Sequence, residues 1–183
     1  AQAPVSWNYR QHPRIISVFS ELWATPPEDL LVSFDGLSLG LPPEVTNKGY
    51  DTGRVELHVD QAPDTPEFKT YQAWVTATDV ESQDFTITVI PGSHALFPEL
   101  VSHFHLDGNK DWLHMTPAYM DFYQSRGLSP IRLSVPKGAM VVWDSRTVHC
   151  ATKPIRGRPS PNTRAIIYFC YVPRSQATEK QLA

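Results

Sequence analysis

The chain has 183 residues, enough for one domain with a real core, because a chain of this size can bury roughly 70% of its unfolded surface. Its 16 basic and 19 acidic residues give a formal net charge of −3 without any run of five like charges, which argues against a nucleic-acid or anionic-membrane partner. No apolar run approaches the ~20 residues of a membrane span, and residues 1–10 lack the pattern of a signal peptide. We therefore expect a cytoplasmic protein.

The expected secondary structure begins with a helix. Residues 14–23 read RIISVFSELW and place Phe19 and Trp23 on one helical face. The consecutive prolines Pro26 and Pro27 end the pattern. This segment predicts one amphipathic helix that supports the rest of the fold.

The remaining chain predicts short strands joined by ordered loops. The 17 prolines exceed the usual ~5% and interrupt any longer element. A second helix is expected over 116–127, where Thr116 can cap, Pro117 suits the first turn and Gly127 can end the helix. Runs rich in β-branched and aromatic residues mark eight strands, over residues 30–34, 53–60, 69–80, 84–91, 131–135, 139–144, 146–151 and 164–172.

Eight short strands without βαβ alternation predict a mainly β fold, a double-stranded β-helix (jelly roll, cupin-like) with a few buttressing helices. We expect residues 1–183 to form one domain. The longest gap between strands, 92–130, could cover one mouth of the roll, and we expect it to hold the determinants of substrate specificity. The two cysteines, Cys150 and Cys170, are expected to be reduced.

A metal site is indicated by the stretch RVELHVDQAP. Side chains alternate along a strand, so His58 and Asp60 share one face if the strand continues. His149, in WDSRTVHC, lies on another predicted strand that a jelly roll can bring alongside. Two histidines and one carboxylate leave open positions on the metal, an arrangement typical of non-haem Fe(II) oxygenases that use O₂. Zinc more often takes a closed tetrahedral set.

A cation is expected for the co-substrate of such a centre. 2-Oxoglutarate chelates the metal at one end and offers a free carboxylate at the other. Arg164 opens the last predicted strand, and its planar guanidinium can hold a carboxylate through two hydrogen bonds. Arg156 and Arg158, in the loop KPIRGRPSPN, are rivals for this role, although a Pro- and Gly-rich loop is a less rigid platform.

Five segments, LHVDQAP, YQAWVTATDV, TVIPGSH, GAMVVWDSRTVHCA and TRAIIYFCYVP, together resemble the phytanoyl-CoA dioxygenase family of Fe(II)- and 2-oxoglutarate-dependent oxygenases. The resemblance covers residues 30–172 and rests on the order and spacing of the segments. It implies that His58, Asp60 and His149 bind iron and that Arg164 binds the far carboxylate of 2-oxoglutarate. It also implies that Trp74 lies beside the co-substrate, and Gln72 shares its face by alternation.

The sequence departs from the family in two places. The stretch QDFTITVIPGSH has no glycine before Gly92, where many relatives carry a Gly-rich segment. The segment YDTGRVELHVD lacks the aromatic and His-rich character of close relatives, and the helical portion that usually precedes the roll is reduced if the chain begins at residue 1. These departures leave the metal set intact and put the substrate pocket in doubt.

Three further histidines are expected outside the iron site. His94 follows a turn and suggests a structural role, whereas His103 and His105 suggest exposed or lid residues, with substrate contact as the alternative. Asp144 and Arg146 can pair to support His149 or can simply form a solvated turn.

We expect hydroxylation of a small-molecule substrate. The alternatives are a non-catalytic jelly-roll module used for binding or assembly, and a cupin-like enzyme with another metal and no 2-oxoglutarate.

Overall fold

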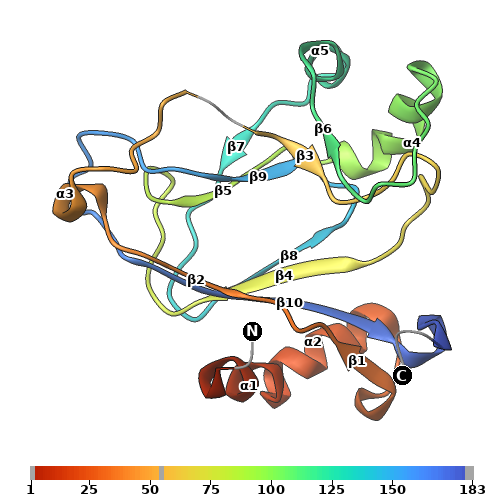
Figure 1. Cartoon of the computed structure of the whole chain (residues 1–183), viewed down its shortest axis with the longest axis horizontal. Helices are drawn as coiled ribbons and strands as arrows, with labels where there is room; N and C mark the ends of the chain where they lie inside the picture. The colour runs from red at the N-terminus through yellow and green to blue at the C-terminus, as the bar shows by residue number, and fades with distance from the viewer. Residues whose placement is uncertain (1–2, 54–55, 180–183) are drawn as a thin grey trace.

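The computed structural model describes residues 3–53 and 56–179, which form two antiparallel β-sheets that face each other (Figure 1). The first sheet has the order β1-β10-β4-β8, and β2 pairs with another part of β10. The second sheet has the order β6-β3-β9-β5-β7. The strands are β1 (Leu30–Val32), β2 (Leu37–Gly40), β3 (His58–Val59), β4 (Tyr71–Thr76), β5 (Thr86–Val89), β6 (Leu113–His114), β7 (Ile131–Arg132), β8 (Met140–Asp144), β9 (His149–Thr152) and β10 (Arg164–Pro173).

Helices lie outside this pair of sheets. They are α1 (Pro4–Arg10), α2 (Pro13–Trp23), α3 (Pro43–Thr46), α4 (Ser93–His103) and α5 (Pro117–Gln124), with 3₁₀ turns η1 (Pro27–Asp29) and η2 (Arg174–Gln176). Helices α1 and α2 cover the outer face of the first sheet (Figure 1). Ile15 and Phe19 of α2 are buried there with Phe169 and Tyr171 of β10. The other face of β10 is therefore the one directed between the sheets.

A second core fixes the strand that carries His58. Val59 of β3 is fully buried in a cluster with Phe97 of α4 and Phe122 of α5. The ladder between β3 and β9 places His58 directly opposite His149. The packing of α4 and α5 thus anchors, through Val59, the strand on which one histidine lies.

The mainly β, jelly-roll prediction is confirmed, as are the helices expected at 14–23 and 116–127. Thr116 caps α5, because its side chain accepts a hydrogen bond from the Tyr119 backbone N–H at 3.3 Å. Each of the eight expected strands is present. Most of these strands are shorter than expected, because the residues at their ends do not pair with a neighbouring strand and belong to loops.

The strand expected over 53–60 was predicted too long. Only His58 and Val59 pair with neighbouring strands, and residues 54–55 lie outside the described part of the chain. Strands β2 and β6 were not expected. Both are short and lie on sheet edges, where pairing with β10 and β3 decides their conformation rather than local sequence.

Candidate metal centre

Three potential metal ligands meet at one end of the second sheet. His58 on β3 and His149 on β9 face each other, and Asp60 follows β3 directly. Asp60 is held in its own position because its backbone N–H donates to the Ser145 carbonyl at 3.2 Å. The ligand atoms of the three residues all lie within 4.8 Å of one another, and in the described chain they form the one such cluster of His, Cys, Asp or Glu.

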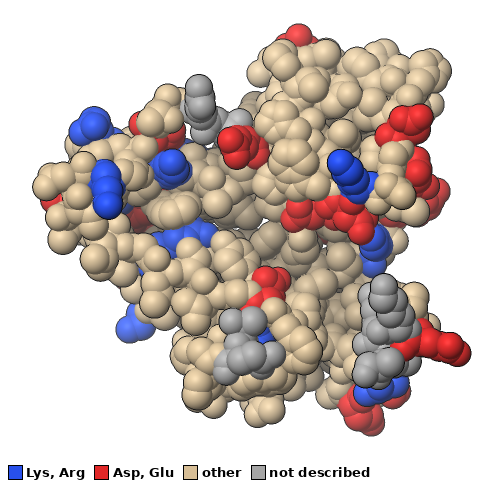
Figure 2. Space-filling model, viewed as in Figure 1, with Lys and Arg blue, Asp and Glu red and all other residues tan. Residues whose placement is uncertain are grey.

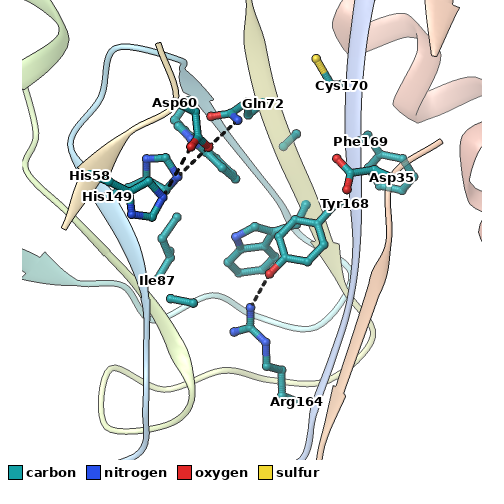
Figure 3. A pocket seen from close by; sticks show the side chains of 14 residues that line it. Asp35, His58, Asp60, Gln72, Ile87, His149, Arg164, Tyr168, Phe169 and Cys170 are labelled. Carbon is teal, nitrogen blue, oxygen red and sulfur yellow. Dashed lines mark hydrogen bonds and ion pairs between the residues drawn. The ribbon is translucent and has the colours of Figure 1, made fainter. Parts of the chain in front are cut away.

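Both imidazoles direct the same nitrogen at the carboxylate. The Nε2 atoms of His58 and His149 lie 3.6 and 3.5 Å from the two oxygens of Asp60 (Figure 3). The Nδ1 atoms lie 2.8 and 2.9 Å from the carbonyl oxygens of Glu56 and Thr147, two residues earlier in each case. A carbonyl can only accept, so each Nδ1 carries the proton and each Nε2 keeps a lone pair. Both histidines are therefore oriented as metal ligands.

The surroundings favour the protonation states that a metal requires. Burial lowers the pKa of His58, and the neighbouring His149 lowers it further. Burial raises the pKa of Asp60, but the close contact with His149 and the hydrogen bond from Gln72 outweigh it and hold the pKa of this carboxyl below its usual value. A neutral imidazole and an ionised carboxylate are the forms that bind a divalent cation, so metal binding displaces few protons near neutral pH.

The donor set fits a non-haem iron better than a structural zinc. Two imidazole nitrogens and one carboxylate supply three ligands from adjacent chain segments. They leave further coordination positions for small ligands, as in the facial triad of Fe(II) oxygenases. A structural zinc site would instead be closed by a fourth protein ligand.

Gln72 supports the carboxylate from the opposite sheet. It lies on β4, and its Nε2 donates to Asp60 Oδ2 at 2.7 Å. Outer hydrogen bonds of this kind orient the ligand and typically change metal affinity 10–100-fold. Gln72 therefore contacts a candidate ligand directly, a role closer to the metal than its predicted place beside the co-substrate.

Gln72→Leu is expected to weaken Fe(II) binding by roughly tenfold or more, because Asp60 loses the donor that aims it. The dissociation constant can be measured anaerobically by competition with a chelating dye. Cys170→Ser is a matched control, since Cys170 pairs with Gln72 across β4 and β10 and lines the same cavity. Equal affinities for wild type and Gln72→Leu would contradict this role.

The three ligands open into a cavity of about 300 Å³ between the sheets. The space-filling surface is hollowed between the two layers (Figure 2). Tyr168 and Ile87 line the middle of the cavity, and Arg164 lies at the end away from the metal ligands (Figure 3). Trp74 is a buried part of the same wall. The structure thus brings together all six residues expected at the site: His58, Asp60, His149, Arg164, Trp74 and Gln72.

Arg164 is buried and held rigidly. Its Nε donates to Ser38 Oγ at 3.1 Å, its Nη1 to the Phe85 carbonyl at 2.8 Å and its Nη2 to the Tyr168 hydroxyl at 2.9 Å. The guanidinium also lies over the Phe85 ring at 4.2 Å. A guanidinium has five N–H donors, so two remain for a ligand carboxylate, and the Tyr168 O–H can donate a third.

The rival arginines lie elsewhere. Arg158 is buried and makes ion pairs with Glu44 and Asp84. Arg156 is exposed, with its guanidinium 4.1 Å from the ring of Tyr50. Neither lines the cavity that contains His58 and His149. Arg158 instead ties its loop to α3 and to the start of β5.

Arg158→Ala should lower the free energy of unfolding by about 3 kcal/mol, because it leaves the buried carboxylate of Asp84 without its cation. Chemical denaturation would measure the loss. Arg156→Ala in the same loop is the control and should change stability by less than about 0.5 kcal/mol. If the two variants are equally stable, the buried ion pairs do not hold this loop.

The other polar candidates stand apart from the ligand cluster. His103 and His105 are exposed at the end of α4 and just after it, and His94 is half-buried in the first turn of α4. Asp144 and Arg146 form an ion pair of 2.7 Å, and the support of His149 by this pair stays a prediction. Both cysteines are free.

Three contacts near the site were not predicted from the sequence. Tyr168 contacts Arg164, Ser38 does so from the unexpected strand β2, and Trp112 packs 5.6 Å from His58 between ring centres. Alternation along β10 could have placed Tyr168 on the same face as Arg164. No local signal could have placed Ser38 or Trp112, because both depend on edge-strand pairing.

The fold is shared with solved structures, among them enzymes described as non-haem and alpha ketoglutarate dependent, and alpha ketoglutarate is 2-oxoglutarate. EctD from S. alaskensis in its apoform is 16% identical, with a TM-score of 0.66 over 100% of this chain and 58% of that one. The carbocyclase SnoK from nogalamycin biosynthesis, described as alpha ketoglutarate dependent, is 22% identical, with a TM-score of 0.62 over 93% and 59%. The epimerase SnoN, solved with Fe³⁺, alpha ketoglutarate and nogalamycin RO, is 17% identical, with a TM-score of 0.57 over 93% and 59%.

A sequence relative is also known. "Ava biosynthesis cluster protein O" from Aspergillus versicolor is 26% identical over 184 residues, which is 96% of this chain. The chain spans 56% of the length of that relative. No protein-family model matches the chain.

The comparisons establish the fold of the chain. The chain has the double-stranded β-helix of the non-haem Fe/2-oxoglutarate-dependent enzymes, and its His-Asp-His cluster could hold a metal. Within the described residues, no helix is long and apolar enough to cross a membrane.

Proposed function

We propose that this chain is a non-haem Fe(II)- and 2-oxoglutarate-dependent dioxygenase that hydroxylates a small molecule, and that it is related to the phytanoyl-CoA dioxygenase family. One observation carries the proposal. The triad His58, Asp60 and His149 and the buried cation Arg164 line the same cavity. A metal at one end and a guanidinium at the other match a co-substrate that has a chelating end and a free carboxylate.

The residues have separate tasks in this proposal. His58, Asp60 and His149 hold Fe(II), and Gln72 keeps the carboxylate of Asp60 aimed at the metal. Arg164 and the Tyr168 hydroxyl bind the far carboxylate of 2-oxoglutarate. Trp74 and Ile87 supply an apolar wall between these two ends, which excludes water and strengthens the charged contacts.

The iron with O₂ and 2-oxoglutarate supplies the oxidising chemistry, and the protein supplies geometry and electrostatics. The names of the structural neighbours include an epimerase and a carbocyclase, so the same apparatus serves several outcomes on this fold. Hydroxylation is the outcome we propose for this chain.

The test is an anaerobic titration of the metal-free protein with Fe(II) and then 2-oxoglutarate, followed through the visible charge-transfer band of the chelate. Wild type should develop the band, His58→Ala should lose it, and Cys170→Ser should behave as wild type. A folded wild-type protein that gives no band would overturn the proposal and favour a binding module. Fe(II) binding without any response to 2-oxoglutarate would favour a cupin-like enzyme that does not use this co-substrate.

A further inference from the structure

An exposed tryptophan stands beside one candidate metal ligand. The ring centre of Trp112 lies 5.6 Å from that of His58. Trp112 also stacks on His114, the neighbour of His58 in the ladder between β6 and β3, with 5.7 Å between ring centres and 24° between planes. His58 lies in turn 4.7 Å from His149. Trp112 therefore ends a continuous row of rings that begins inside the metal centre.

The segment around Trp112 is fixed on both sides. Asp111 accepts from the Ala62 backbone N–H at 3.3 Å and pairs with Lys69 at 2.6 Å. Leu113, the next residue, pairs with Val59 in the ladder between β6 and β3. Both anchors connect Trp112 to the segment that carries His58 and Asp60. The indole is thus held in place relative to the metal ligands.

Trp112 is nevertheless 51% exposed. The other four tryptophans, all in the described part of the chain, are buried or half-buried. Leaving half of an indole in water forgoes hydrophobic stabilisation, and rigid exposed aromatic rings are typical of binding surfaces. An exposed, fixed ring next to a reactive centre can provide the contact surface for a substrate.

We propose that Trp112 is the platform on which the substrate stacks, and that the substrate carries a flat unsaturated ring. The inference rests on the proposed function of the site and names its substrate class. A metal about 2.1 Å from His58 Nε2 would lie within roughly 9 Å of the Trp112 ring centre. A ring stacked on the indole would cover part of this distance, and a substituent of a few atoms on that ring would cover the rest.

The alternative role for Trp112 is to shield His58 from water. A shield would act on metal binding and would be indifferent to the shape of the substrate. A platform would act on substrate binding and would leave the iron complex unchanged. The two roles therefore predict opposite results in separate measurements.

The test uses two probes of the same carbon skeleton, flat 2-naphthol and its saturated, puckered analogue decahydro-2-naphthol. Calorimetry is done under argon on protein loaded with Fe(II) and 2-oxoglutarate. We expect 2-naphthol to bind more tightly than the saturated probe, roughly tenfold weaker binding of 2-naphthol in Trp112→Ala, and near-normal binding in Trp112→Phe. Leu22→Ala, an exposed residue on the distant helix α2, is the control and should bind as wild type.

The charge-transfer band of each variant keeps this test separate from the proposed function. A normal band in Trp112→Ala with weakened 2-naphthol binding supports the platform. Equal binding of the two probes, no binding of 2-naphthol, or no effect of Trp112→Ala would overturn it. Loss of the band in Trp112→Ala and Trp112→Phe would overturn it in favour of the shield. Absence of the band in wild type would instead count against the iron site itself.

Discussion

Asp60→Ala is expected to abolish stable Fe(II) binding and with it all consumption of 2-oxoglutarate. The two imidazoles alone lie on adjacent strands with their Nε2 atoms directed at the missing carboxylate. Loss of a ligand that also supplies the negative charge should exceed the roughly 10–100-fold cost of losing a supporting hydrogen bond. Metal content after dialysis, measured by atomic absorption, reports the loss directly.

A control separates this effect from the loss of any acidic residue. Asp121 is exposed on α5, and Asp121→Ala should retain a full equivalent of iron. Thermal unfolding of metal-free Asp60→Ala should show a folded protein, since the contacts of Asp60 with the two imidazoles lie at a partly exposed edge. Retention of one tightly bound Fe(II) in Asp60→Ala would remove the triad as the metal site.

Arg164→Ala is expected to raise the 2-oxoglutarate concentration needed for half-saturation of the chelate by roughly 100-fold or more. Truncating one partner of a buried, charged hydrogen-bonded pair costs about 2–5 kcal/mol. Iron binding should stay unchanged, because Arg164 contacts none of the three ligands. The measurement is the same anaerobic titration, read as a function of 2-oxoglutarate at saturating Fe(II).

Arg164→Lys keeps the charge but loses the planar fork, so its affinity should fall between those of wild type and Arg164→Ala. Tyr168→Phe should weaken 2-oxoglutarate by a few-fold, because it removes one donor and leaves the guanidinium in place. An Arg164→Ala protein that titrates with 2-oxoglutarate like wild type would show that the cation at this end of the cavity has another purpose.

Local pattern was sufficient for several features of this protein. Proline and glycine placement with β-branched runs predicted eight of the strands and two helices, because turns and caps depend on neighbouring residues. The sequence also predicted the residue types of the site. An imidazole and a carboxylate two residues apart, a later histidine and an arginine at the start of the last long strand are unusual enough together to indicate their chemistry.

Only the tertiary structure decided how those residues meet. The sequence argument placed His58 and Asp60 on one face of a continuous strand, whereas the strand ends at Val59 and a hydrogen bond to the Ser145 carbonyl positions Asp60. The sequence favoured Arg164 over Arg158 for its position on a strand. Only the structure shows that Arg164 lines the cavity and that Arg158 is paired with distant Glu44 and Asp84.

The two edge strands β2 and β6 could not be predicted from the sequence. Strands β2 and β6 have weak local signals, yet β2 brings Ser38 to Arg164 and the segment leading into β6 brings Trp112 to His58. Short edge segments take their conformation from the strand they join, and that partner is far away in sequence. The sequence by itself therefore determined the chemical groups and the class of fold. The long-range pairing determined which groups share the cavity.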